Sequence, residues 1–327
     1  MNDLSKDAVN WLAVGDDAEG QRIDNYLARI LKGVPKSHIY RILRSGEVRV
    51  NRRRVGPDAR LAAGDRLRIP PIRMASTARK APMASNRTPA IPPTLFEDDA
   101  VIALNKPAGL AVHGGSGIAQ GVIERLRQAR PEAAFLELVH RLDRDTSGVL
   151  LIAKKRSALT GLHAQLRDGA IDKRYLVLVR GKWRDAVRAV ELPLATWHTG
   201  GGERRVRVDP QGRLARTVFR RLRTWPGVEP PVALLEAELE TGRTHQIRVH
   251  LAHLGFPLAG DEKYGDFAWN RELARQGLKR MFLHAHRIRF AHPGDGREVA
   301  IEAPVPPELA AFLARLDVTQ AADTDAG

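Results

Sequence analysis

The stretch LVHRLDRDTSGVLLI, residues 138–152, sets a crowded polar segment between two apolar ones. Residues 137–142 alternate apolar and polar side chains, which is typical of a strand, and residues 149–152 form an unbroken apolar run of buried-strand length. Between them lie aspartates, arginines, a Thr-Ser pair and a glycine. Neighbouring arginines keep a carboxylate ionised, and a turn fixed between core strands keeps it rigid. Both are what a carboxylate that takes part in chemistry requires. An ordinary surface ion pair is the competing interpretation, and other segments must decide between the two.

Positive charge is concentrated in residues 20–80, which hold 16 lysines and arginines against 4 acids and so carry +12 of the net charge of +15. Helical spacing of apolar residues predicts helices over 23–31 and over 38–45, the second capped by Ser37. Short alternating strands are expected around residues 48–50 and 67–69. A basic module of this kind predicts nucleic-acid binding, although a solvated basic face has the same composition. Its few aromatic residues indicate contacts to phosphates rather than base stacking.

Small residues and prolines without periodicity mark residues 74–93 as a linker. We therefore predict a flexible leader at 1–18, the basic module at 19–73, a second domain at 94–317 and a disordered tail at 318–327. In the second domain strands outnumber helices, and they do not alternate regularly. The expected fold class is α+β, with a mixed, mainly antiparallel sheet flanked by helices and loops.

Several classes of protein are excluded by composition. The chain has no cysteine, so disulfides and thiolate metal sites are ruled out. Its first residues lack the basic and apolar segments of a signal peptide, and its apolar runs are far shorter than the roughly 20 residues of a membrane span. We expect a cytoplasmic protein that does not bind membranes.

A second dense stretch, ETGRTHQIRVHLAHLG, occupies residues 240–255. A strand over 234–239 would deliver Arg243 to a strand end, and Thr244 is expected to cap the helix that follows. The three histidines of this stretch match no zinc spacing, and the glycines of residues 115–121 miss the dinucleotide-binding spacing by one residue. We therefore expect neither a metal nor a cofactor.

Three groups far apart in the sequence are each expected at the edge of a core strand. They are Asp143 (beside Arg141), Tyr175 and Arg243. Together they supply a carboxylate, a phenol and a guanidinium, and the carboxylate could act as a nucleophile or electrostatic partner of an electron-poor carbon. The basic module indicates RNA, whose base must be turned out of its stack before chemistry. The residues alone leave base isomerisation and glycosidic cleavage open. Asp145, the rival carboxylate, is expected to brace the turn.

Residues 20–73 resemble the S4 RNA-binding domain, through RIDNYL at 22–27 and SHIYRILRSGEVRVN at 37–51. The resemblance implies that the two helices and the adjoining strand loop of this S4-like module face structured RNA. The candidate RNA-binding residues are Arg22, Lys36, Ser37, Arg41, Arg44, Arg49, Asn51, Arg52, Arg53 and Arg54.

The signature HRLDRDTSG at 140–148 is similar to that of the RluA family of pseudouridine synthases. Agreement continues through NKPAG at 105–109, KRY at 173–175, GRTHQIRVH at 242–250 and FLHA at 282–285, and it covers residues 93–305. The resemblance implies a cofactor-free isomerase that cleaves the N1–C1′ bond of uridine, rotates the uracil and rejoins it through C5.

The same resemblance implies the role of each site residue. Asp143 matches the essential carboxylate, and Arg243 matches the arginine paired with it. Tyr175 matches the tyrosine that stacks on the base and is a candidate to take the C5 proton. Arg141, which would fill the gap left by the flipped base, and Leu283 and His140 are the candidate substrate-binding residues. A covalent bond from Asp143 to the ribose and formation of a glycal are both compatible with this set.

Within the family, residues 113–117 and 144–150 are most similar to enzymes that modify 23S rRNA of the large ribosomal subunit. We therefore expect a monomer that acts on 23S rRNA within large-subunit precursors. One alternative is the same chemistry on another rRNA site or on a tRNA. The other is a non-catalytic, ribosome-associated RNA-binding protein that rests on the S4-like module alone.

Overall fold

The computed structural model describes residues 8–72 apart from 32, 33 and 35, and residues 91–114, 120–199 and 204–325. The chain divides into two compact units, Met1–Pro89 and Ala90–Gly327, which are described separately. Most of the expected linker (residues 74–90) and part of the glycine loop (115–119) lie outside the described residues. No helix of the described residues is both long and apolar enough to cross a membrane.

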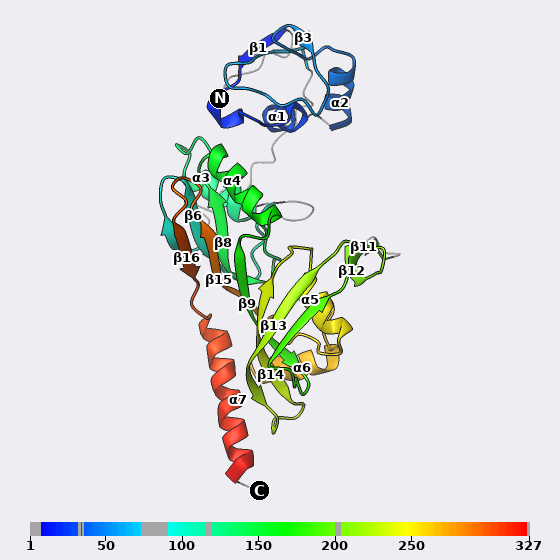
Figure 1. Ribbon diagram of the computed structural model, residues 1–327, viewed down its shortest axis with the longest axis vertical. Coiled ribbons are helices and arrows are strands. Elements are labelled where there is room, and N and C mark those ends of the chain that lie inside the picture. Colours follow the sequence, from blue (N-terminus) through cyan, green and yellow to red (C-terminus); the bar gives the residue numbers. More distant parts are fainter. Residues whose placement is uncertain are drawn as a thin grey trace, which may run out of the picture. The chain divides into compact units, whose positions relative to one another are not determined.

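The first unit packs two helices on a small antiparallel sheet of strand order β1-β4-β2-β3 (Figure 1). Its helices are α1 (Ile23–Ile30) and α2 (Lys36–Arg44), and its strands are β1 (Asn10–Ala13), β2 (Arg49–Val50), β3 (Arg53–Arg54) and β4 (Arg66–Ile69). Leu27, Ile39 and Leu67 are buried in the shared core. The helical spacing seen in the sequence therefore corresponds to the faces that pack on the sheet.

Two expectations for this unit are wrong. Residues 10–13 are not part of a flexible leader, because they form β1 and pair with all four residues of β4. Ser37 does not precede the second helix, because α2 begins one residue earlier at Lys36. The first difference arises because β1 pairs with a strand more than fifty residues away, which a local pattern does not reveal. The second is a shift of one residue at a helix end.

The second unit is built on a sheet of ten strands among its described residues, with order β10-β13-β14-β9-β15-β8-β6-β5 and with β16 and β7 beside β15 and β8 (Figure 1). The strands are β5 (Thr94–Glu97), β6 (Val101–Lys106), β7 (Glu137–Leu138), β8 (Ser147–Ala153), β9 (Asp172–Arg180), β10 (Val187–Glu191), β13 (Arg216–Trp225), β14 (Val232–Leu239), β15 (Leu283–Ala291) and β16 (Glu298–Glu302). Among these pairs only β8 with β15 is parallel. The expected α+β class with a mixed, mainly antiparallel sheet is confirmed.

Helices and a small hairpin complete this unit. They are α3 (Val122–Ala129), α4 (Arg156–Arg167), α5 (Gln246–His253), α6 (Phe267–Arg275), α7 (Pro307–Asp325) and the two-stranded sheet of β11 (Leu194–His198) and β12 (Arg204–Val208). Because α7 continues to Asp325, the expectation of a disordered tail from residue 318 is wrong for most of that segment.

The apolar run of β8 is continuous because both faces of the strand are covered. Leu150 and Ile152 belong to the core that contains α3, whereas Val149 and Leu151 belong to the core that contains α4. A strand buried on both faces has no polar alternation. Because both faces of β8 are buried, the position of its first residue is fixed. The polar loop that precedes β8 therefore ends at a fixed position as well.

Gly148 lies where β8 meets β15 and has a φ of +113°. A Cβ at this position would lie 2.2 Å from the carbonyl oxygen of Ala285. We expect Gly148→Ala to lower the free energy of unfolding by about 3 kcal/mol, through backbone strain and overpacking. Gly161 of α4 is the matched control, because its Cβ would meet only Pro293 at 3.5 Å. Denaturant unfolding should show Gly161→Ala as stable as the parent, and equal midpoints for the two variants would contradict this account.

Candidate active site

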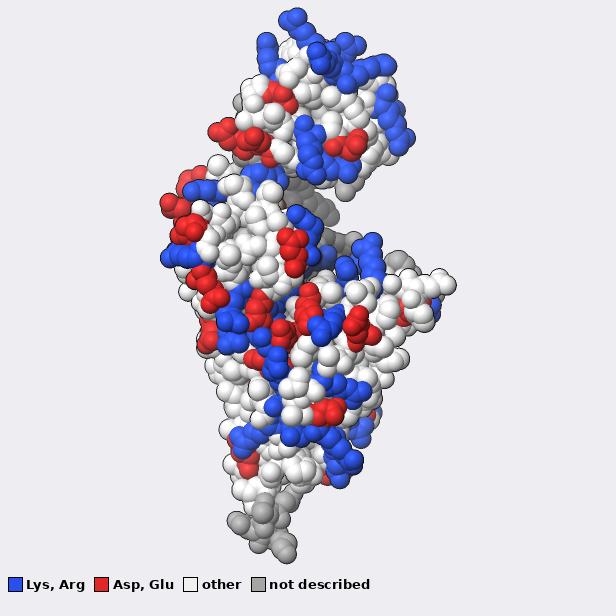
Figure 2. All heavy atoms as spheres, in the orientation of Figure 1, with Lys and Arg blue, Asp and Glu red and all other residues white. Residues whose placement is uncertain are grey.

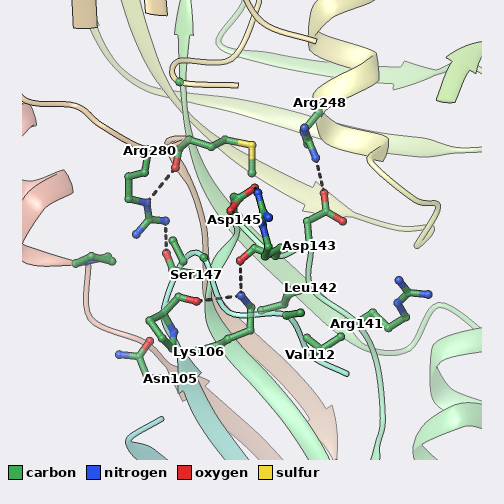
Figure 3. A pocket seen from close by; sticks show the side chains of 18 of the residues that line it. Asn105, Lys106, Val112, Arg141, Leu142, Asp143, Asp145, Ser147, Arg248 and Arg280 are labelled. Carbon is green, nitrogen blue, oxygen red and sulfur yellow. Dashed lines mark hydrogen bonds and ion pairs between the residues drawn. The ribbon is translucent and has the colours of Figure 1, made fainter. Parts of the chain in front are cut away.

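Asp143 lies on the loop between β7 and β8, beside a cavity of about 1250 Å³ (Figure 3). The N–H of Thr146 donates to the backbone oxygen of Asp143 at 3.2 Å, which closes the turn. Most charged side chains along the cavity are basic, among them Arg141, Lys263 and Lys279. The cavity therefore suits an anionic ligand, and Asp143 places a carboxylate at its wall.

The partner of Asp143 is Arg248, which projects from α5 toward the loop (Figure 3). Its Nη1 donates to Oδ2 of Asp143 at 2.9 Å, while its Nε and Nη2 donate to both carboxylate oxygens of Asp261 at 2.7 and 2.8 Å. Burial alone would raise the pKa of the fully buried Asp261, but the bonds from Arg248 outweigh it and hold that pKa below its ordinary value. One guanidinium is thus fixed by a buried carboxylate and presented to Asp143.

The expectation that Arg243 pairs with Asp143 is wrong. Arg243 is exposed, and its Nε donates to the carbonyl of Leu214 at 3.1 Å. Helix α5 begins at Gln246 after His245, which has a φ of +55°, and Thr244 provides no cap. The side chain of Gln246 instead accepts from the N–H of Arg243 at 3.0 Å. The later helix start leaves Arg243 outside and brings Arg248 to the loop.

His245 is the second group beside Asp143, with its Nε2 3.8 Å from Oδ2 of Asp143. Burial lowers the pKa of His245 to about 4, so the ring is neutral at pH 7. Its Nδ1 is hydrogen-bonded to the hydroxyl of Tyr264 at 2.8 Å, and that hydroxyl accepts from the N–H of Val206 at 2.9 Å. The Tyr264 hydroxyl can therefore donate its own proton to Nδ1 of His245. The single proton of the neutral ring is then on Nε2, which faces Asp143.

Lys106 holds the loop that carries Asp143. Its side chain is fully buried, and Nζ donates to the carbonyls of Pro107, Leu110 and Arg144 at 3.0, 2.7 and 2.9 Å. Burial lowers the pKa of Lys106 to about 7. Lys106 is the last residue of β6, and Arg144 directly follows Asp143. The Lys106 side chain therefore ties the loop that carries Asp143 to the end of β6.

Tyr175 lies near enough to Asp143 for the carboxylate charge to act on its phenol, and Leu283 is the apolar residue that the sequence proposes beside the base. Both are buried in one apolar cluster that also contains Leu142. Burial, with a smaller effect of the Asp143 charge, raises the pKa of Tyr175 above its ordinary value. A phenol that stays protonated is suited to packing against a base and poorly suited to accept a proton.

The remaining predicted site residues separate into two groups. Arg141 is exposed, lines the cavity and extends away from Asp143 (Figure 3). His140, expected to bind substrate, instead accepts a hydrogen bond from the N–H of Leu151 at 3.1 Å and holds the loop to β8. Asp145 does not brace the turn as expected, because it forms a surface ion pair with Arg144 at 3.2 Å.

The candidate RNA-binding residues of the first unit are mostly exposed, and Figure 2 shows Lys and Arg side chains crowding its visible surface. Arg22 is tied to Asp24 at 2.8 Å, and Asn51 bonds to Asp65 at 2.7 Å. No side-chain hydrogen bond or ion pair joins Arg52 or Arg53 to another residue in the described part of the chain. These two arginines, at the turn between β2 and β3 and at the start of β3, are the most available to phosphates. The other exposed candidates are Ser37, Arg41, Arg44, Arg49 and Arg54, and Lys36 begins α2.

Sequence reasoning did not assign the residues that hold Asp143, namely Arg248, Asp261, His245, Tyr264 and Lys106. Lys106 lies in the stretch NKPAG, and His245 and Arg248 lie in the stretch GRTHQIRVH, so these stretches were visible in the sequence and the roles of the residues were not. A buried arginine requires a buried carboxylate, and that rule could have linked Arg248 to Asp261.

Comparisons with known proteins identify the family of this chain. The family model described as RNA pseudouridylate synthase matches residues 100–253, and the S4 domain model matches residues 21–67. Proteins named ribosomal large subunit pseudouridine synthase C from Pasteurella multocida and Escherichia coli (strain K12) are each 51% identical to this chain. Each alignment covers 94% of this chain, and it covers 94% and 97% of the two relatives respectively.

Solved structures extend the similarity to the fold. Human RNA pseudouridylate synthase domain containing 1 has a TM-score of 0.56 and 25% identity, over 70% of this chain and 90% of that one. The aligned relatives span almost the whole chain, including both units. The chain therefore belongs to the RluA family of pseudouridine synthases, as a member with an N-terminal S4 domain, and it is an RNA pseudouridine synthase.

Proposed function

We propose that this enzyme converts specific uridines of 23S rRNA to pseudouridine. The observation that carries the proposal is the Asp143 carboxylate, held by Arg248 at the wall of a cavity rich in basic side chains. The names of its relatives, ribosomal large subunit pseudouridine synthase C, support the choice of RNA. We also propose that it acts as a cytoplasmic monomer on large-subunit precursors.

In the proposed reaction Asp143 acts at C1′ of the target uridine. The N1–C1′ bond breaks, the uracil turns within the cavity, and C5 bonds to C1′. The C5 proton is lost and N1 regains a proton, so the product is an isomer of the substrate. Arg248 keeps the Asp143 carboxylate oriented, and neutral His245 adds a dipole on the same side.

Binding requires the target base to leave its stack. We assign the apolar surface for the uracil to Tyr175 and Leu283, which are buried in one cluster with Leu142 of the cavity wall. Arg141, which lines the cavity, takes the vacated space in the RNA. His140 positions the loop and does not itself contact the base.

Mapping pseudouridines tests the choice of RNA. RNA from cells that lack this protein should lose pseudouridine at defined 23S positions, and expression of the intact chain should restore them. Loss at tRNA or at 16S positions alone would replace 23S rRNA with that RNA. No loss in any RNA would contradict the proposed substrate.

The S4 domain is expected to supply much of the salt-dependent affinity. Removing residues 1–89 should leave a folded catalytic unit, because the chain divides at this point. The truncated protein should bind a 23S fragment more weakly, with a smaller slope of log affinity against log salt, because it neutralises fewer phosphates. Filter binding between 50 and 200 mM salt measures both. An unchanged slope would show that the S4 domain does not neutralise phosphates of the RNA.

A further inference from the structure

A second hollow of about 510 Å³ lies between the β11–β12 hairpin and residues 242–244, which lead into α5. Its lining includes Arg204, Arg213 and Arg243 but no acidic residue. The backbone of Gly242 is open on this side, because a Cβ there would meet no atom within 4 Å. Three guanidiniums beside open backbone form a site for an anion.

The arginines of this groove differ from their neighbours in pairing. Arg207 is paired with Asp209 at 3.1 Å, and Arg216 is paired with Glu240. Within the described residues, no ion pair joins Arg204, Arg213 or Arg243 to a carboxylate. Charges that lack an internal partner remain available to an external one.

The groove adjoins the cavity beside Asp143. Thr244 lines both the groove and the catalytic cavity, and it precedes His245 beside Asp143. The hairpin wall is also fixed, because the N–H of Val206 donates to the Tyr264 hydroxyl at 2.9 Å and Lys263 Nζ donates to the carbonyl of Arg204 at 2.6 Å. A ligand in the groove would therefore sit at a set position relative to Asp143.

We propose that this groove binds a phosphodiester of the substrate RNA strand beside the target uridine. The inference rests on the proposed RNA substrate and assigns to Arg243, with Arg204 and Arg213, the binding of backbone phosphate. Such contacts carry no sequence information, but they fix the register of the strand and so determine which nucleotide reaches Asp143.

The test compares two triple variants of the full chain. The groove variant carries Arg204→Gln, Arg213→Gln and Arg243→Gln. The control carries Arg207→Gln, Arg271→Gln and Arg275→Gln, which removes the same charge from exposed positions that do not line the groove. Both should unfold at the parent's temperature, because none of these positions is buried.

With a 23S rRNA fragment, the groove variant should lose at least tenfold in affinity, and its salt slope should fall by about one for each phosphate that it no longer neutralises. The control should change less than threefold. The turnover of the groove variant at saturating RNA should stay within a few-fold of the parent, which distinguishes binding from chemistry. Equal affinities of the two triple variants would overturn the proposal.

A scan of neutral methylphosphonate linkages in the same RNA identifies the phosphate. The parent should lose affinity at one flanking linkage, and the groove variant should be insensitive at that linkage. Sensitivity of both proteins at every linkage would also overturn the proposal. Affinity is measured without turnover, so a parent that binds this RNA but makes no pseudouridine in it contradicts the 23S assignment, while the groove is still judged by affinity.

Discussion

Replacing Asp143 with asparagine is expected to reduce pseudouridine formation by roughly 10⁴-fold or more, the order of loss when a residue that performs the chemistry is removed. The amide keeps the shape of the side chain but cannot stabilise or bond to C1′ as a carboxylate. Affinity for RNA should remain near that of the parent, because the basic surfaces are unchanged. Single-turnover assays on a 23S fragment, with filter binding in parallel, measure both effects.

Asp145→Asn is the matched control, since it makes the same change two residues away. Asp145 is paired with Arg144 at the surface, so we expect a far smaller loss of turnover. Asp143→Asn should also stay folded, because Arg248 keeps its two bonds to Asp261. Near-normal turnover of Asp143→Asn would show that the carboxylate assignment is wrong.

Replacing Arg248 with methionine is expected to affect both stability and activity. Asp261 is fully buried and would lose both hydrogen bonds from the guanidinium. Leaving a buried charge without its partner costs about 3–5 kcal/mol, which denaturant unfolding would measure. Turnover should fall at least ~100-fold, because Asp143 also loses the donor that orients its carboxylate.

A double variant separates these two effects. Arg248→Met combined with Asp261→Asn removes the unpaired charge, so it should recover part of the stability while turnover stays low. Arg275→Gln is the single-arginine control, because this exposed side chain is paired with Glu272 of the same helix. Recovery of turnover in the double variant would mean that Arg248 acts through folding alone.

Local sequence was enough to predict most elements, and the family motif at residues 140–148 proposes Asp143 as the chemical carboxylate. The strand expected over residues 234–239 lies within β14, which runs from Val232 to Leu239. The approach of Tyr175 to Asp143 was also expected, and the two lie near enough for the Asp143 charge to act on the phenol. The structure near the ends of the chain was harder to predict from the sequence, because β1 forms through its pairing with the distant strand β4.

The partner of Asp143 could not be read from the sequence. Arg243 and Arg248 belong to the same dense stretch, and α5 is buried on nearly all sides, from Gln246 to Leu251. A helix without a solvent face gives no periodic pattern, so the direction of each side chain is not encoded locally.

The sequence by itself determined the two units, the loop of residues 138–152 and the charge of the S4 domain, and its family motifs indicated the class of reaction. Only the tertiary structure decided which arginine serves Asp143. Burial of Arg248 requires a carboxylate, and Asp261 provides it from a turn 13 residues away. That pairing holds Arg248 at the catalytic loop and leaves Arg243 exposed, at the groove that we assign to the RNA backbone.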